Sequence, residues 1–238
     1  MCELIAVGGA RPFALGALWP TTHAVERYGI AGFGWGVAWR TATGAFGLHT
    51  STGAFATDPE RERMGAIETT SALIHLRRPS RLSTIGLPDT QPFLDPEGRF
   101  CFGHNGDLTR YRDLRPAFAA AGRIQGRADS EVGQRWLEDH WGEAPDQDPC
   151  HQLGALHGRL GGQANLMALA ADGSIHVLAG NTENPVFTYT LGDLRIVSTG
   201  IHSIDRSLFR LCVPDARERR LLRPGEALHP VGAAAARA

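Results

Sequence analysis

The sequence predicts an α+β protein whose sheets are mainly antiparallel, and three observations predict it. Short apolar runs typical of strands lie toward both ends of the chain, and helix signals gather between them. Asp172-Gly173 joins two alternating segments as a hairpin turn does. Strands followed by helices and then by further strands, without regular alternation, favour antiparallel sheets over βαβ units.

Strands are predicted where short apolar runs lie between turn residues. They cover residues 2–8, 34–40, 45–50, 72–77, 99–103, 163–170, 174–180, 185–190 and 194–199. Gly8-Gly9 and Pro12 are expected to end the first strand. Residues 10–31 are otherwise irregular, apart from a short helix near 23–28. A loop rich in proline, serine and threonine is expected to extend to about residue 98.

Helices are predicted from their start and stop signals. Asp58-Pro59-Glu60 begins a helix over 59–70, because aspartate is a favoured N-cap and proline is tolerated at the first helical position. Thr109 is expected to cap a helix over 110–121, which Gly122 closes. Two more helices are expected over 129–141 and 150–160.

Composition indicates one soluble globular unit. Apolar residues make up 42% of the 238 residues, which is enough for a core, and the formal net charge of −1 gives no reason to expect a nucleic-acid partner. No apolar run approaches the roughly 20 residues that span a bilayer, and no secretory signal begins the chain. We expect a cytoplasmic protein without membrane association, with one domain over 1–230 and a disordered tail over 231–238.

The absence of lysine excludes several kinds of chemistry. All 24 basic residues are arginine, whereas a Walker P-loop, a Schiff base and a Ser-x-x-Lys nucleophile each require lysine. The cysteines are scattered, without a C-x-x-C pair or zinc-like spacing to histidine. We therefore expect free thiols, no metal site and no cofactor. The cysteines are Cys2, Cys101, Cys150 and Cys212.

Cys2 is the first candidate for chemistry because it follows the initiator methionine. Removal of Met1 would leave a thiol and a free α-amine on one residue. The thiol has a reference pKa of about 8.5 and the α-amine of about 7.7–8.0, so the amine can serve as the base that activates the thiol. Taken alone, Cys2 is better explained as an arbitrary second residue or as a small apolar residue that begins a buried strand.

Three further positions carry polar groups at the ends of predicted elements. His104-Asn105-Gly106 offers an amide and an N–H to an oxyanion, although a plain Asn-Gly turn is the commoner explanation. Arg77 and Arg78 follow a buried strand, where an arginine can hold a carboxylate bidentately or lie on the surface. Asp129 begins a helix, either as an N-cap or as a partner for a substrate ammonium.

In this order the motifs resemble those of the class II glutamine amidotransferases. The matching segments are Cys2, His75-Leu76-Arg77-Arg78-Pro79-Ser80, Asp89-Thr90-Gln91-Pro92-Phe93, Gly103-His104-Asn105-Gly106 and Ala128-Asp129-Ser130-Glu131. The resemblance implies an N-terminal nucleophile hydrolase, a four-layer αββα sandwich of two mainly antiparallel sheets. The opening Met-Cys-Glu-Leu is similar to a stand-alone branch of the class. That branch includes bacterial single-domain proteins and the amidase subunit of the yeast glutathione-degradation complex.

The resemblance implies a catalytic role for three residues. Cys2 would be the nucleophile, with its own α-amine as base. Asn105 by its side chain and Gly106 by its N–H would form the oxyanion hole. The implied reaction is cleavage of a γ-glutamyl amide through a Cys2 γ-glutamyl thioester.

The resemblance also implies a substrate-binding role for three residues. Arg77 would hold the substrate α-carboxylate, Asp129 would hold its α-ammonium, and Ser80 would line the pocket. These groups contact only the amino-acid end of the substrate, which glutamine and other γ-glutamyl compounds share. The chain departs from the family pattern at Phe33, Gln91, Arg78-Pro79 and Ala128, and Arg78-Pro79 puts the range of substrates in doubt.

Several functions fit this resemblance. The protein could be a stand-alone hydrolase of glutamine or another γ-glutamyl compound, or a glutaminase that docks in trans on a synthase or amidase-complex partner. An ergothioneine-pathway γ-glutamyl hydrolase is a further alternative, although such enzymes usually open Met-Cys-Arg. From a different class, a non-catalytic γ-glutamyl ligand-binding or regulatory module would keep the pocket without turnover.

Overall fold

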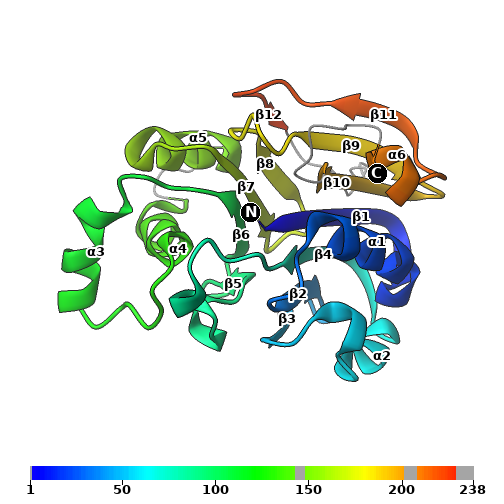
Figure 1. The fold of residues 1–238 in the computed structure, drawn as a ribbon, viewed down its shortest axis with the longest axis horizontal. Helices are drawn as coiled ribbons and strands as arrows, with labels where there is room; N and C mark the ends of the chain where they lie inside the picture. Colours follow the sequence, from blue (N-terminus) through cyan, green and yellow to red (C-terminus); the bar gives the residue numbers. More distant parts are fainter. Residues whose placement is uncertain (1, 143–147, 201–207, 229–238) are drawn as a thin grey trace.

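A computed structural model describes residues 2–142, 148–200 and 208–228. Two antiparallel sheets lie face to face, and helices cover their outer faces (Figure 1). This arrangement confirms the predicted α+β class and the four-layer αββα sandwich. No helix within the described residues is both long enough and apolar enough to cross a membrane.

The larger sheet contains seven strands in the order β11-β9-β10-β1-β4-β2-β3. Their bounds are β1 Glu3–Ala14, β2 Trp35–Arg40, β3 Phe46–Ser51, β4 Glu68–Leu76, β9 Val186–Leu191, β10 Leu194–Thr199 and β11 Arg217–Leu221. The smaller sheet has the order β12-β8-β7-β6-β5. Its strands are β5 Phe93–Leu94, β6 Phe100–Gly106, β7 Ala164–Ala170, β8 Ile175–Leu178 and β12 Ala227–Leu228.

The helices divide between the two outer faces (Figure 1). Those that lie over the larger sheet are α1 Trp19–Gly29, α2 Glu60–Gly65 and α6 Leu208–Cys212. Those that lie over the smaller sheet are α3 Tyr111–Ala120, α4 Asp129–His140 and α5 Pro149–Leu160. Short 3₁₀ helices occupy Leu15–Leu18, Phe55–Thr57, Leu82–Thr84 and Leu87–Asp89.

Three apolar clusters hold the four layers together, and the period-two alternation of the strands assigns residues to them. In β1, Leu4 packs between the two sheets while Ile5 packs beneath the helices of the larger sheet. In β6, Cys101 packs between the sheets while Phe100 and Phe102 face the helices of the smaller sheet. Because both faces of these strands are covered, they appear in the sequence as continuous apolar runs.

The structure corrects the predicted bounds of two elements. The expectation that Gly8-Gly9 and Pro12 end the first strand is wrong, because β1 continues to Ala14. Its pairing with β4 shifts register after Gly8 and resumes at Phe13, so the irregular segment lies within the strand. The helix predicted over 59–70 ends at Gly65, because Glu68 already pairs with Ala14 in the sheet.

Other differences lie in loops and near the C-terminus. Residues 10–31 are more regular than predicted, since α1 begins at Trp19. Thr109 does not cap α3; its hydroxyl lies 3.4 Å from the Leu160 carbonyl oxygen. Neither α6 nor the strands β5, β11 and β12 were predicted, and β5 lies within the loop that was expected to extend to about residue 98. The tail expected over 231–238 lies outside the described residues, whereas the other predicted strands and helices are confirmed to within a few residues.

Candidate active site

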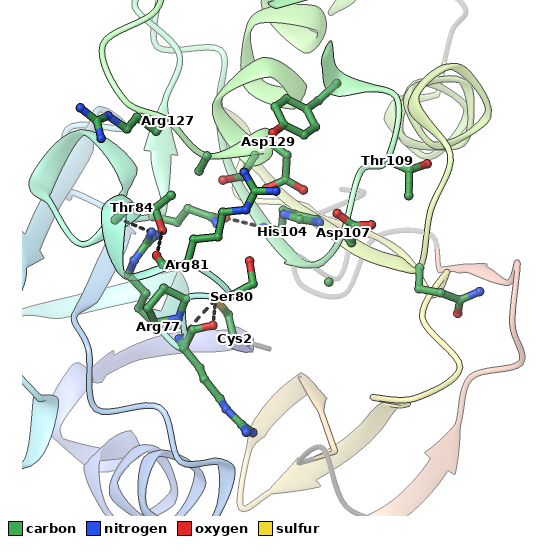
Figure 2. Close-up of a pocket in the computed structure, with 18 of the residues that line it drawn as sticks. Cys2, Arg77, Ser80, Arg81, Thr84, His104, Asp107, Thr109, Arg127 and Asp129 are labelled. Carbon is green, nitrogen blue, oxygen red and sulfur yellow. Dashed lines mark hydrogen bonds between the residues drawn. The ribbon is translucent and has the colours of Figure 1, made fainter. Parts of the chain in front are cut away.

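Four chain segments meet at one edge of the sandwich. Glu3 pairs with Leu76, so Cys2 lies beside the residues that follow β4. The end of β6 and the start of α4 reach the same place, and together they enclose a cavity of about 810 Å³ (Figure 2). Of the six predicted site residues, the five that line this cavity are Cys2, Arg77, Ser80, Gly106 and Asp129. The sixth, Asn105, lies buried beneath them.

The Cys2 thiol lies half-buried against the backbone of Arg78. The Arg78 N–H is 3.4 Å from Cys2 Sγ, and the Arg78 carbonyl oxygen is 3.7 Å from it. Burial raises the pKa of Cys2 above its ordinary value, and the Arg78 N–H and the Arg77 guanidinium only partly oppose this effect. The thiol is therefore protonated at neutral pH and needs a base before it can act as a nucleophile.

A group of asparagines orients Asn105. Asn105 Oδ1 accepts hydrogen bonds from Asn165 Nδ2 at 2.8 Å and from Asn181 Nδ2 at 3.4 Å. Because the acceptor oxygen is engaged by these donors, Asn105 Nδ2 faces Cys2 and donates to its carbonyl oxygen. Asn184 Nδ2 lies 3.4 Å from that same oxygen.

Sequence reasoning missed the three supporting asparagines. One signal was present, because Asn165 is the polar residue within the otherwise apolar run of β7. A polar side chain at such a position requires hydrogen-bond partners inside the protein. Asn165 Oδ1 meets this need by accepting from the N–H groups of Gly180 and Asn181, each at 3.1 Å.

Gly106 occupies a position that excludes a side chain. Its φ is 122°, and an added Cβ would lie 1.9 Å from the Gln163 carbonyl oxygen. Asn105 and Gly106 pair with Asn165 and Ala164 at the end of β6. The alternative explanation of a plain Asn-Gly turn is therefore wrong, since both residues belong to the sheet.

Arg77 is a buried cation that lines the cavity. Its guanidinium donates to the carbonyl oxygens of Thr84 and Asp89, and Figure 2 shows the side chain turned toward Thr84. Across the described ranges, no carboxylate lies within 4.0 Å of this guanidinium. A buried charge without a counter-ion is costly, so this position is suited to binding an anion. Ser80 is exposed on the same cavity wall.

Asp129 supplies a carboxylate on the opposite wall. It is the first residue inside α4, so the N-cap alternative is wrong, and its Oδ2 accepts from the Leu108 N–H at 2.8 Å. A carboxylate in the first helical turn is stabilised by the helix dipole. Asp89 holds the preceding loop, because its Oδ1 accepts from the N–H groups of Arg127 and Ala128 at 2.6 Å each.

Two more residues of the quoted motifs support the end of β6. Gln91 Oε1 accepts from the His104 N–H at 2.6 Å, and the Gln91-Pro92 peptide bond is cis. His104 also lines the cavity, and burial lowers the pKa of its imidazole. Its ring is thus neutral at pH 7, so it adds no positive charge beside Asp129.

The fold is similar to that of N-terminal nucleophile hydrolases. The family model for class II glutamine amidotransferases matches residues 1–198, and the chain belongs to this family. No curated protein sequence matches the chain.

Solved structures share the fold at low sequence identity. Glutamine phosphoribosylpyrophosphate amidotransferase from B. subtilis superposes with a TM-score of 0.73 and 18% identity, covering 96% of this chain and 47% of that one. The allosteric regulatory enzyme of purine biosynthesis gives 0.72 and 17%, covering 96% and 46%. A glutamine aminotransferase class-II domain protein from Silicibacter pomeroyi gives 0.60 and 18%, covering 96% and 94%. The chain thus spans about half the length of the first two and nearly all of the third.

Proposed function

We propose that the protein cleaves γ-glutamyl amides through a covalent thioester on Cys2. One observation carries the proposal: a buried arginine and a carboxylate line the same cavity as a thiol. In the described part of the chain neither Arg77 nor Asp129 forms an ion pair with another side chain. A substrate with an α-carboxylate and an α-ammonium supplies both missing partners, which is the charge pattern of an amino-acid end.

The proposed reaction begins after removal of Met1, which frees the Cys2 α-amine. The amine takes the thiol proton, and the thiolate attacks the γ-carbonyl carbon to form a C–S bond. Asn105 Nδ2 and the Gly106 N–H stabilise the oxyanion. The ammonium then protonates the leaving amine as the C–N bond breaks, and water hydrolyses the thioester.

The oxyanion role of Asn105 is compatible with its present contact. Asn105 Nδ2 already donates to the Cys2 carbonyl oxygen. A carboxamide nitrogen carries two N–H groups, so one can remain on that carbonyl while the other serves the oxyanion. The bonds from Asn165 and Asn181 keep the nitrogen facing Cys2 throughout.

The size and charge of the cavity favour a leaving amine larger than ammonia. A volume of about 810 Å³ is in the range of sites for drug-sized ligands, which are much larger than glutamine. Four arginines beyond Arg77 line the cavity, and within residues 2–142, 148–200 and 208–228 none of them forms an ion pair. They are suited to an anionic group on the leaving amine, and they are Arg78, Arg81, Arg112 and Arg127.

The remaining alternatives predict different products. A glutaminase subunit with a synthase or amidase partner in trans would prefer glutamine and release ammonia to that partner. An ergothioneine-pathway-type hydrolase would prefer a γ-glutamyl compound that carries sulfur. A non-catalytic module would bind a γ-glutamyl ligand equally well before and after Cys2→Ala. The unmutated protein would show no turnover.

The test compares glutamine with a γ-glutamyl peptide as substrate. The intact mass of the purified protein should lack Met1, and Cys2→Ala should abolish amine release while the protein remains folded. A glutamine-like electrophile should label Cys2, not Cys212, because Cys2 lines the cavity whereas Cys212 packs in the apolar cluster beneath the helices of the larger sheet. Retained Met1 in an active enzyme, or turnover by Cys2→Ala, would overturn the mechanism.

A further inference from the structure

Three metal-ligand side chains meet far from the active-site cavity, at the start of α5. Asp148 is the N-cap of that helix, Cys150 lies in its first turn, and His176 comes from β8. Cys150 Sγ lies 3.7 Å from His176 Nδ1, and Asp148 Oδ1 lies 3.8 Å from the same nitrogen. All three ligand atoms lie within 4.8 Å of one another.

The hydrogen bonds behind His176 set the tautomer of its ring. The Ser174 hydroxyl is 2.6 Å from Asp172 Oδ1 and 2.8 Å from His176 Nε2. An ionised carboxylate only accepts, so Ser174 donates its one proton to Asp172 and accepts from Nε2–H. The imidazole therefore carries its lone pair on Nδ1, which faces Cys150 and Asp148. Histidines that bind metals usually have their other ring N–H held by a polar group such as a carboxylate, which orients the ring. Here Asp172 holds the ring through the Ser174 hydroxyl.

The spacing of the ligand atoms is close to that around zinc. Zinc lies about 2.3 Å from a thiolate and about 2.0–2.1 Å from an imidazole nitrogen, so a tetrahedral angle separates these two atoms by about 3.5 Å. The observed separation between Cys150 Sγ and His176 Nδ1 is 3.7 Å. The same geometry puts nitrogen and carboxylate oxygen about 3.4 Å apart. The observed value for Asp148 and His176 is 3.8 Å. These two separations are thus within about 0.4 Å of the tetrahedral values, and the third pair, Cys150 Sγ and Asp148 Oδ1, lies within 4.8 Å.

A fourth electron-rich atom lies beside the thiol. The Leu228 carbonyl oxygen is 3.0 Å from Cys150 Sγ. Cys150 and His176 are both buried, with relative exposures of 3% and 4%. The Asp148 side chain is 35% exposed, so the group lies at the edge of the buried interior. Lone pairs from a carboxylate, a thiol, an imidazole and a carbonyl gathered in one place are stabilised by a cation.

We propose that Asp148, Cys150 and His176 form a structural zinc site that joins the start of α5 to β8. Thiolate, imidazole and carboxylate together are the ligand types that zinc takes, whereas magnesium and calcium take oxygen ligands. The site would fasten the helix layer to the smaller sheet next to β12, away from the residues proposed for catalysis. The proposed zinc site would stabilise the fold and would take no part in the reaction, so this inference is independent of the proposed function.

Each contact also has a simpler explanation, which the test has to separate from zinc binding. Asp148 Oδ1 accepts from the Cys150 N–H at 3.0 Å, as an N-cap aspartate does. A thiol can donate to an imidazole or a carbonyl without any metal. These explanations account for the contacts one at a time, but they predict no saturable binding of one metal ion.

The experiment is a cobalt and zinc titration of the full chain carrying Cys2→Ala, which removes the active-site thiol from the measurement. We expect one equivalent of Co²⁺ to bind with thiolate-to-cobalt charge-transfer absorption, and Zn²⁺ to displace it. Zn²⁺ should also raise the melting temperature in proportion to the logarithm of its concentration. Cys150→Ser should abolish the thiolate absorption, and the matched control Cys212→Ser should retain it.

Two conservative variants keep the test decisive if Cys150→Ser does not fold. His176→Gln and Asp148→Asn should each weaken Zn²⁺ binding more than about 100-fold, since the first removes the imidazole ligand and the second removes the negative charge of the carboxylate ligand. Ser174→Ala leaves the direct ligands in place and should weaken it about 10- to 100-fold. Sub-stoichiometric binding, thiolate absorption that persists in Cys150→Ser, or unchanged affinity in His176→Gln would overturn the proposal.

Discussion

Replacing Asn105 with alanine removes the amide nitrogen proposed to stabilise the oxyanion. The side chain is fully buried, and its Oδ1 accepts from Asn165 and Asn181 while its Nδ2 donates to the Cys2 carbonyl oxygen. Asn165 Nδ2 also donates to the Asn184 carbonyl oxygen at 2.7 Å, so the substitution does not leave it unpaired. The structural damage is therefore limited to the loss of the Asn105 side chain and of the bond that Asn181 donates to it.

The expected kinetic effect is larger than the expected loss of stability. Removing one oxyanion donor costs about 10²–10³ in kcat, or about 2.7–4 kcal/mol of transition-state stabilisation. Lost buried hydrogen bonds cost about 1–3 kcal/mol of folding free energy, which a protein with a typical 5–15 kcal/mol of stability tolerates. KM should change little, because Arg77 and Asp129 hold the amino-acid end of the substrate in the ground state.

The assay measures steady-state amine release from the better of the two substrates, with urea unfolding of each variant in parallel. Gln152→Ala is the matched control, because it removes a buried amide that donates to the His140 carbonyl oxygen at 2.6 Å in the helix layer. We expect Gln152→Ala to keep its kcat within about threefold and Asn105→Ala to lose at least about 100-fold. Folded Asn105→Ala with a kcat close to that of the control would refute the oxyanion assignment.

Three further predictions follow from the same geometry. Arg77→Met and Asp129→Asn should each raise KM at least tenfold with a smaller change in kcat, because each removes one charge that holds the substrate. Steady-state kinetics with an unchanged KM would contradict the assignment. Gly106→Ala should lower the free energy of unfolding in urea more than Gly122→Ala does. Both glycines have positive φ, but only at Gly106 would an added Cβ collide with the backbone of another residue. Equal losses would show that small backbone shifts remove this collision. Burial lowers the pKa of His75 well below its ordinary value, so the unfolded chain takes up a proton that the folded one does not. The free energy of unfolding should therefore be highest above about pH 6.5 and should fall by up to about 1.4 kcal/mol per pH unit below it. His75→Gln should reduce this dependence of the free energy of unfolding on pH.

The fold was largely predictable because its layers depend on local patterns. Strands buried on both faces appear as apolar runs, and the period of two in β1 and β6 assigns their residues to the clusters on either side. Errors arose where tertiary pairing overrides local signals. β4 begins at Glu68 because β1 supplies a partner there, which no helix propensity in 59–70 reveals. The exposed, arginine-rich β11 lacks an apolar pattern and went unpredicted.

By itself, the sequence determined which chemical groups the chain offers and in what order. It supplied Cys2, Arg77, Asn105, Gly106 and Asp129, and its lack of lysine excluded several other kinds of chemistry. These inferences hold without coordinates because they depend on residue type and on position relative to strand and helix ends.

Only the tertiary structure decided which groups act on one another. Asn165 orients Asn105 across paired strands. Asp148 and Cys150, at the start of a helix, lie close to His176 in the sheet beneath that helix. Such contacts join residues 26 or more positions apart in the chain, at spacings that no helix or strand period encodes. They exist because burying the apolar faces of the sheets brings the polar ends of separate elements together.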